Sequence, residues 1–64
     1  MKLIEVNKAV GETGRFNLHY INPNHIIEVF EWMNQTVIRL RDVGEIRCIN
    51  TLSDILNKIS QVEK

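Results

Sequence analysis

Apolar and polar residues alternate along most of the chain before Asn50, which is the spacing of strands that are buried on one side. The alternation is clearest in residues 15–21, RFNLHYI, where Phe16, Leu18 and Tyr20 share one face. The pattern predicts strands over residues 2–6, 15–21, 26–32, 36–41 and 45–49. Residues 7–14, NKAVGETG, break the pattern with two glycines and are predicted to be a loop, or a wide hairpin connection.

Short polar segments between these strands have the composition of turns. In residues 22–25, NPNH, Pro23 presets the backbone for the second turn position, and asparagine side chains can hydrogen-bond the local backbone. Residues 33–35, MNQ, and residues 42–44, DVG, are predicted to be tight turns. Strands joined by such short connections run antiparallel.

Beyond Asn50 the apolar period changes from two to three or four. The apolar residues of this stripe are Leu52, Ile55, Leu56, Ile59 and Val62. They predict a helix over residues 51–62, with Thr51 as its N-cap and Asp54 at its positive end. The chain is therefore expected to be one α+β domain, residues 1–64, in which an antiparallel β-meander of four or five strands carries one C-terminal α-helix on one face.

Residues 26–32, IIEVFEW, carry more large apolar side chains than one buried face can use. Ile27 and Val29 suit the core, which would leave Ile26, Phe30 and Trp32 on the outer face. Either this strand is central in a small barrel or covered by the 7–14 loop, or its outer face contacts another protein. The second reading predicts an interface with a second copy of the chain or a larger protein, made by Ile26, Phe30, Trp32 and Met33.

Length and charge narrow the classes of function. A chain of 64 residues has a small core, so association with other chains is a common way to stabilise it. Eight basic residues balance eight acidic ones, which makes nucleic acid an unlikely partner because phosphate binding favours a basic excess. The sequence has no signal-peptide pattern and no apolar run that could span a membrane, so a cytoplasmic location is expected.

Residues that could carry catalysis or bind a metal are few. His19 and His25 do not have the spacing of a known metal motif, and Cys48 lies at a core position of its predicted strand, where thiols are usually inert. Residues 11–14, GETG, lack the lysine and the following helix of a phosphate-binding loop. The sequence therefore predicts neither a catalytic residue, a metal site nor a cofactor.

Several basic side chains fall on outward positions of the predicted strands. Their forked or ring nitrogens could bind carboxylate or phosphate groups of a nucleotide-like ligand at a junction between subunits. These candidates are Arg15, His19, Arg39, Arg41 and Arg47. The alternative is that Glu28, Glu31 and Glu45 pair with the arginines across neighbouring strands.

The order of these signals resembles that of the small FlbD (SwrD-like) proteins of flagellar and swarming operons. The resemblance covers about residues 16–60, through INPNHIIEV, QTVIRL, a glycine turn and IRCINTLSDILNKI. The chain departs from the family after the first strand, where NKAVGETGR replaces a compact Asn-Gly turn. The resemblance implies a small, non-enzymatic protein that modulates a larger machine, with no catalytic residue to carry over.

Two other classes share general features with this chain. Short phage-encoded inhibitors and ligand-sequestering proteins are similar in size, in charge balance and in their reliance on oligomerisation. A LytTR-like DNA-binding module is a third possibility, although the short length and zero net charge weigh against it. The expected function is thus binding without catalysis, with an anionic-ligand inhibitor and a nucleic-acid-binding regulator as the alternatives.

Overall fold

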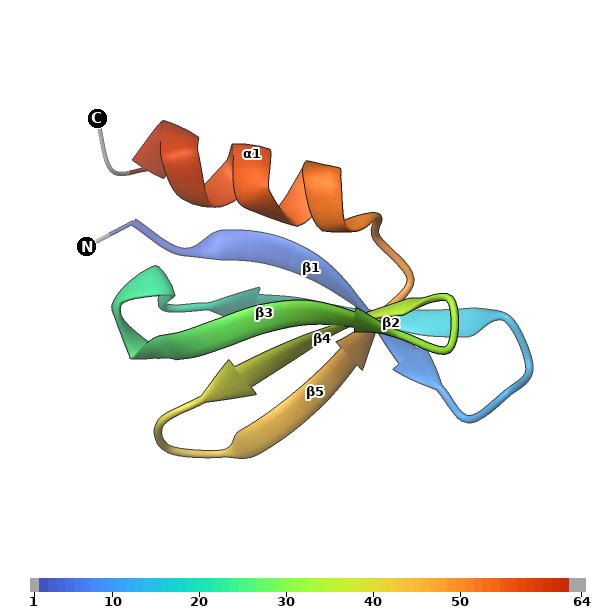
Figure 1. The fold of residues 1–64 in the computed structure, drawn as a ribbon. Helices are drawn as coiled ribbons and strands as arrows, with labels where there is room; N and C mark the ends of the chain where they lie inside the picture. The colour runs from blue at the N-terminus through green and yellow to red at the C-terminus, as the bar shows by residue number, and fades with distance from the viewer. Residues whose placement is uncertain (1, 63–64) are drawn as a thin grey trace.

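A computed structural model describes residues 2–62 as a five-stranded antiparallel sheet with one C-terminal helix packed against it (Figure 1). The α+β fold class predicted from the sequence is confirmed. The elements are β1 (Ile4–Val10), β2 (Arg15–Ile21), the 3-10 turn η1 (Pro23–His25), β3 (Ile26–Trp32), β4 (Gln35–Leu40), β5 (Gly44–Cys48) and α1 (Leu52–Val62).

The sheet joins a hairpin to a three-stranded meander, with the strand order β2-β1-β5-β4-β3. Strands β3, β4 and β5 follow one another through tight turns, whereas β1 and β2 form the separate hairpin. The two parts meet at one short seam, where Lys8 pairs with Cys48 and the Ile49 amide donates to the Asn7 carbonyl at 2.9 Å. This order makes β2 and β3 the edge strands of the sheet.

Strand β1 is longer than its sequence suggests. The sequence prediction ended it at Val6 and placed residues 7–10 in a loop, but the structure continues the strand to Val10. The reason is its partner: β1 and β2 pair residue for residue from Ile4 opposite Ile21 to Val10 opposite Arg15. Cross-strand hydrogen bonds thus override the weak strand propensity of this segment, and only residues 11–14 form the turn.

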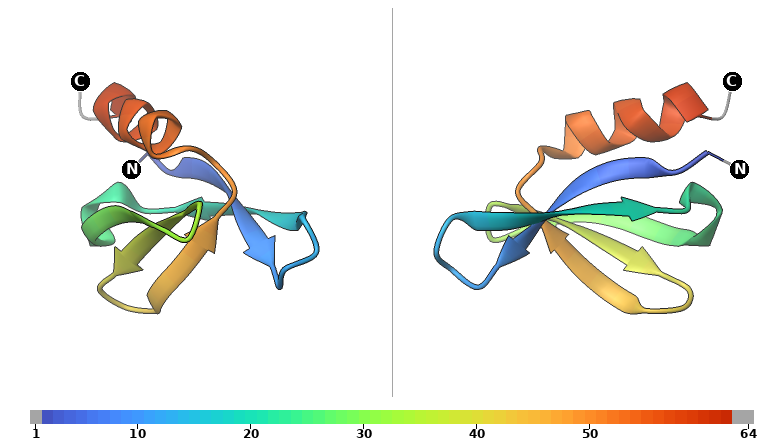
Figure 2. Two further views of the ribbon diagram at one scale, coloured as in Figure 1. Left: turned by 45° about the vertical axis from the view of Figure 1, so that its right-hand side comes forward. Right: turned by 180° about the vertical axis from the view of Figure 1, so that it is seen from behind.

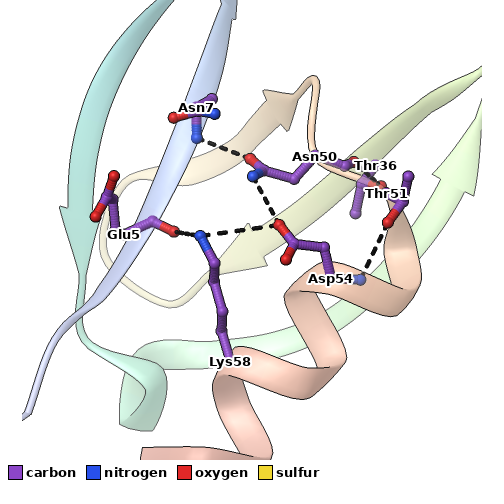
Figure 3. A network of polar contacts seen from close by, with 7 residues as sticks. All are labelled: Glu5, Asn7, Thr36, Asn50, Thr51, Asp54 and Lys58. Atoms are coloured by element: carbon purple, nitrogen blue, oxygen red, sulfur yellow. Dashed lines mark hydrogen bonds and ion pairs between the residues drawn. The ribbon is translucent and has the colours of Figure 1, made fainter.

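Asn50 holds the hairpin, the meander and the helix together (Figure 3). Its side-chain oxygen accepts from the Asn7 amide at 2.8 Å, and its side-chain nitrogen donates to the Asp54 carboxylate at 2.9 Å. Its carbonyl accepts from the buried Thr36 hydroxyl at 2.7 Å. Next to it, the Lys58 ammonium donates to the Glu5 carbonyl at 2.8 Å. Side chains of this junction therefore supply hydrogen-bond partners for the backbone of β1 where β5 no longer pairs with it.

Helix α1 begins as the sequence predicted. The Thr51 hydroxyl accepts from the Asp54 amide at 3.1 Å, which is an N-cap bond, and the Thr51 carbonyl accepts the first helical bond from the Ile55 amide. Ile55 is fully buried against the sheet. Among the described residues, no helix combines the length and the apolar character needed to cross a membrane.

The core lies between α1 and the inner face of the curled sheet, which Figure 2 shows from two further directions. Its buried members are Ile4, Val6, Ile38, Leu40, Ile46, Cys48 and Ile55. The alternate side chains of the same strands form the outer face of the sheet, away from the helix.

Ile26 was assigned to the wrong face by sequence alternation. A break in the β3–β4 register between Ile26 and Glu28 inserts an extra residue, so that Ile26 packs against the core together with Val29. Ile27, which the alternation placed in the core, is instead 59% exposed. A bulge of this kind shifts the facing of every residue before it, and nothing in the local sequence marks it.

The Asn50 junction can be tested by replacing Asn50 with alanine. Asn50→Ala removes the acceptor of the Asn7 amide and one of the two partners of the Asp54 carboxylate, so the free energy of unfolding should fall by about 1–3 kcal/mol in urea denaturation. Asn57→Ala, at an exposed position of the same helix, is the matched control and should change it by less than about 0.5 kcal/mol. Equal effects of the two substitutions would contradict the role of Asn50.

Candidate functional site

Large apolar side chains remain exposed on the outer face of the sheet. The pairing register places the outer-facing residues of β2 (Phe16, Leu18, Tyr20), of β3 (Phe30, Trp32), of β4 (Val37) and of β5 (Arg47) on this side. Phe16, Leu18, Tyr20 and Trp32 are each between 48% and 59% exposed. Within residues 2–62 no helix covers this face, because α1 packs on the other one. Exposed apolar area of this kind is typical of a binding surface.

Trp32 and Arg47 lie close together on this surface. The Arg47 guanidinium carbon lies 4.9 Å from the centre of the Trp32 ring, within the range of a cation–π contact. Val37 lies in the strand between them and is 96% buried although it belongs to the outer face. These three residues line a small hollow together with Phe30 and Glu45. Trp32 and Arg47 thus meet over the buried Val37, and both side chains remain exposed.

A larger cleft opens beside them between two turns, and we call it the turn cleft. Its volume is about 710 Å³. It is lined by Ala9, Gly11, Glu12, Gly14, Arg15, Trp32, Met33, Asn34, Gln35, Arg47 and Ile49. The turn cleft brings Trp32 and Met33, predicted as interface residues, together with Arg15 and Arg47, predicted as anion-binding residues. Two separate expectations from the sequence thus meet in one place.

The Met33–Asn34 turn that forms one wall of the cleft has an unusual backbone. Both residues have positive φ angles, 50° and 64°, as a two-residue hairpin turn of type I′ requires. Asparagine tolerates this conformation, but methionine rarely adopts it because its Cβ meets the backbone. Met33 is nevertheless there and is 74% exposed. An unfavourable residue at an exposed position of a cleft makes this turn a candidate functional position.

The remaining arginines of the predicted anion set do not join the cleft. Arg39 lies between two carboxylates, 2.7 Å from Glu28 and 3.2 Å from Glu45, so its charge is already balanced by cross-strand pairs. Arg41 follows β4 at the opposite end from the Met33–Asn34 turn, where its amide donates to the His25 carbonyl. The structure therefore divides the five predicted residues and keeps only Arg15 and Arg47 together.

His19 lines a second cavity, of about 590 Å³, near the opposite end of the sheet. At its rim His25 Nδ1 lies 3.2 Å from an Asp42 carboxylate oxygen, and both side chains are solvent-accessible. Among residues 2–62 no three histidine, cysteine or acidic side chains are placed to hold a metal ion. The second cavity thus brings polar groups together without the arrangement that metal binding requires.

Cys48 has the environment of a structural thiol. It is fully buried in the core, and burial raises the pKa of its thiol from the usual 9.0 to about 11, although the nearby Lys58 and Lys8 charges oppose the change. A thiol with this pKa is protonated at neutral pH and is a poor nucleophile.

The part of the surface that sequence reasoning missed is β2. Its alternation was recognised, but the sequence did not say which face meets the core. In the structure only Ile21 of this strand packs against the core, and Phe16, Leu18 and Tyr20 point to the outer side and are exposed. The local sequence gave no signal of this exposure, because the polar row of Arg15, Asn17 and His19 on the other side would favour burial of the apolar row.

Replacing Met33 with asparagine should stabilise the fold. Met33→Asn removes the steric cost of a positive φ, so the free energy of unfolding should rise by about 0.5–1 kcal/mol in chemical denaturation. Asn34→Ala is the matched control in the same turn and should lower it. A Met33→Asn variant that is less stable than the parent would show that the methionine side chain supports the fold.

The buried thiol should make stability depend on alkaline pH. The unfolded chain releases the Cys48 proton near pH 9 and the folded chain only near 11, so the unfolded state binds fewer protons in this interval and stability falls as pH rises. The loss should approach about 2–3 kcal/mol above pH 11. Urea denaturation of the parent and of Cys48→Ala should therefore converge between pH 9 and 11, and a constant difference would contradict the raised pKa.

Comparisons of the chain with models of known protein families, with curated protein sequences and with solved structures return no match. The resemblance to the FlbD proteins remains a prediction from the sequence. A function must accordingly be argued from the geometry of the outer face and the turn cleft.

Proposed function

We propose that this protein is a non-enzymatic binding module that docks a partner protein on the outer face of its sheet and so modulates a larger assembly. The observation that carries the proposal is the stacked pair of Trp32 and Arg47 beside the turn cleft. Tryptophan and arginine are the residue types that most often dominate the affinity of protein interfaces. Here they are fixed on strands and stand at the edge of a concave surface.

The chemistry of the turn cleft favours a partner segment that is apolar with an acidic group. Trp32, Met33 and Ile49 offer apolar contact area, while Arg15 and Arg47 offer two positive charges. Glu12, which also lines the turn cleft, would repel a densely negative ligand. A polyanion such as nucleic acid is therefore a poorer fit than a protein segment carrying one carboxylate.

A second candidate function is capture of a small anionic ligand in the same cleft. Two arginine forks can bind phosphate or carboxylate bidentately, and the Trp32 ring can stack on a base. The cleft volume of about 710 Å³ lies in the range of small-molecule sites. This would correspond to the phage-type inhibitor or ligand-sequestering class considered from the sequence. A DNA- or RNA-binding regulator remains the weaker alternative.

The FlbD resemblance and a cytoplasmic location belong to this proposal as well. A regulator of a flagellar or similar machine would act by docking and would need no cofactor. The strained Met33 supports the same view, because its side chain contributes flexible apolar surface that binding sites commonly use.

The docking proposal predicts that Trp32→Ala abolishes partner capture. Because Trp32 is half exposed, the variant should stay folded by circular dichroism, while losing at least about 2 kcal/mol of binding, or roughly thirtyfold in affinity. The test compares partners recovered by the immobilised parent, by Trp32→Ala and by Arg47→Ala, followed by titration calorimetry with the purified partner. Val43→Ala, at an exposed turn residue outside the cleft, is the control and should bind normally.

Undiminished binding by Trp32→Ala and by Arg47→Ala would overturn the docking proposal. The small-ligand alternative has its own readout, which is the melting temperature in the presence of nucleotides. A rise that is lost in Arg15→Ala with Arg47→Ala would favour that alternative. Steep weakening of heparin binding with salt would point to nucleic acid instead.

A further inference from the structure

Strand β2 has an edge with which no strand pairs among residues 2–62. It is the first strand of the sheet order and lies toward the viewer in the right-hand view of Figure 2. Residues 15–20 are all exposed. The strand is seven residues long and has one permanently charged side chain, Arg15, at its end. A long, nearly uncharged edge strand is a template for pairing with another chain, which proteins otherwise prevent with charges or bulges.

The hydrogen-bonding groups on this edge can be identified from the other side of the hairpin. The Asn7 amide donates to Asn50 and the Asn7 carbonyl accepts from Ile49, so both groups point away from β2. Asn7 lies opposite Leu18, which makes them a pair without mutual hydrogen bonds. The Leu18 amide and carbonyl therefore point to the open edge. By the strand period of two, those of Phe16 and Tyr20 do as well.

The other edge strand is protected in ways that β2 is not. Strand β3 carries Glu28 and Glu31, and its register breaks between Ile26 and Glu28. Charges and bulges are the devices that discourage edge pairing. The asymmetry between the two edges indicates that β2, rather than β3, is the strand open to association.

We propose that two copies of this protein pair through β2 in antiparallel fashion about a two-fold axis at Leu18. Leu18 is the midpoint of Arg15–Ile21, so this register uses the whole strand. It places Leu18 opposite itself and Phe16 opposite Tyr20 of the second copy. The edge-facing groups of these three residues then form three hydrogen-bonded pairs, with about six backbone hydrogen bonds in all. The two five-stranded sheets would become one continuous sheet.

The strand is complementary to itself in this register. On the outer side an aromatic pair, Phe16 with Tyr20, stands on each side of a leucine pair, which is a favourable set of cross-strand contacts. On the other side Asn17 meets His19 and Arg15 meets Ile21, so no two like charges are opposed. A symmetric contact between identical surfaces closes as a dimer and leaves no further β2 edge exposed.

This inference goes beyond the docking role and does not depend on it. Leu18 lies on β2 and Trp32 on β3, at opposite edges of the sheet order. A dimer formed through β2 would carry two turn clefts, so it could hold a partner with two binding segments more tightly than one copy could.

The test uses the fact that a two-fold axis places residue 18 opposite itself. Sedimentation velocity of the parent should show a concentration-dependent species with twice the 7.5 kDa mass of one chain. Leu18→Lys and Leu18→Glu each set like charges opposite one another and should weaken the dimer at least about tenfold. An equimolar mixture of the two variants should restore a dimer, seen as a heterodimer by native mass spectrometry. Val43→Lys, at an exposed turn residue, is the control and should dimerise like the parent.

Amide hydrogen exchange gives an independent readout of the register. In the dimer the amides of Phe16, Leu18 and Tyr20 should be protected, and in Leu18→Lys they should exchange freely while the Asn17 and His19 amides stay protected by β1. A parent that stays monomeric at every accessible concentration would overturn the inference. A dimer that Leu18→Lys does not weaken, or variants that fail to combine, would do the same. Trp32→Ala should leave the dimer intact, so failure of the docking role can be told apart from failure of this one.

Discussion

The fold depends on which groups hydrogen-bond to the backbone of β1 beyond the point where its pairing with β5 ends. The hairpin and the meander share only a short seam at Lys8 and Cys48, and beyond it the strands separate. Asn50 takes the place of a neighbouring strand by accepting from the Asn7 amide, and it is fixed in turn by Asp54 and Thr36. Leaving this partly buried amide without a partner would cost on the order of 1 kcal/mol or more, which is a large share of the stability of so small a domain.

The position of the helix and the exposure of β2 follow from this separation. Because β1 leaves β5 near its middle, α1 can pack over Ile4 and Val6 and close the core from that side. The hairpin then projects from the sheet, and β2 meets the core only through Ile21. The apolar row of β2 is consequently turned to the outer side of the sheet, the side that also carries Trp32 and Arg47. One backbone junction thus determines both the open edge and the extent of the outer face.

Two features of the outer face suit binding: the contact between Trp32 and Arg47, and the unfavourable backbone conformation of Met33. Trp32 and Arg47 lie on strands and contact each other over the buried Val37, an arrangement that reduces the side-chain entropy lost when a partner binds. Met33 sits beside them in a turn conformation that a stability-optimised sequence would assign to asparagine or glycine. Binding surfaces commonly retain such costs, because stability is sacrificed where function needs a particular side chain.

The sequence by itself determined the elements that local rules govern: the strand periods of β2 to β5, the Pro23 turn, the two tight hairpin turns and the Thr51 cap of α1. It also predicted Ile26, Phe30, Trp32 and Met33 as interface residues and Arg15, His19, Arg39, Arg41 and Arg47 as anion-binding candidates. Only the tertiary structure decided that β1 extends to Val10, that Ile26 faces the core, and that Trp32 and Met33 of the first set share one cleft with Arg15 and Arg47 of the second. These outcomes depend on cross-strand pairing, a bulge and the Asn50 junction, all of which join residues far apart in the chain, and a local pattern does not record them.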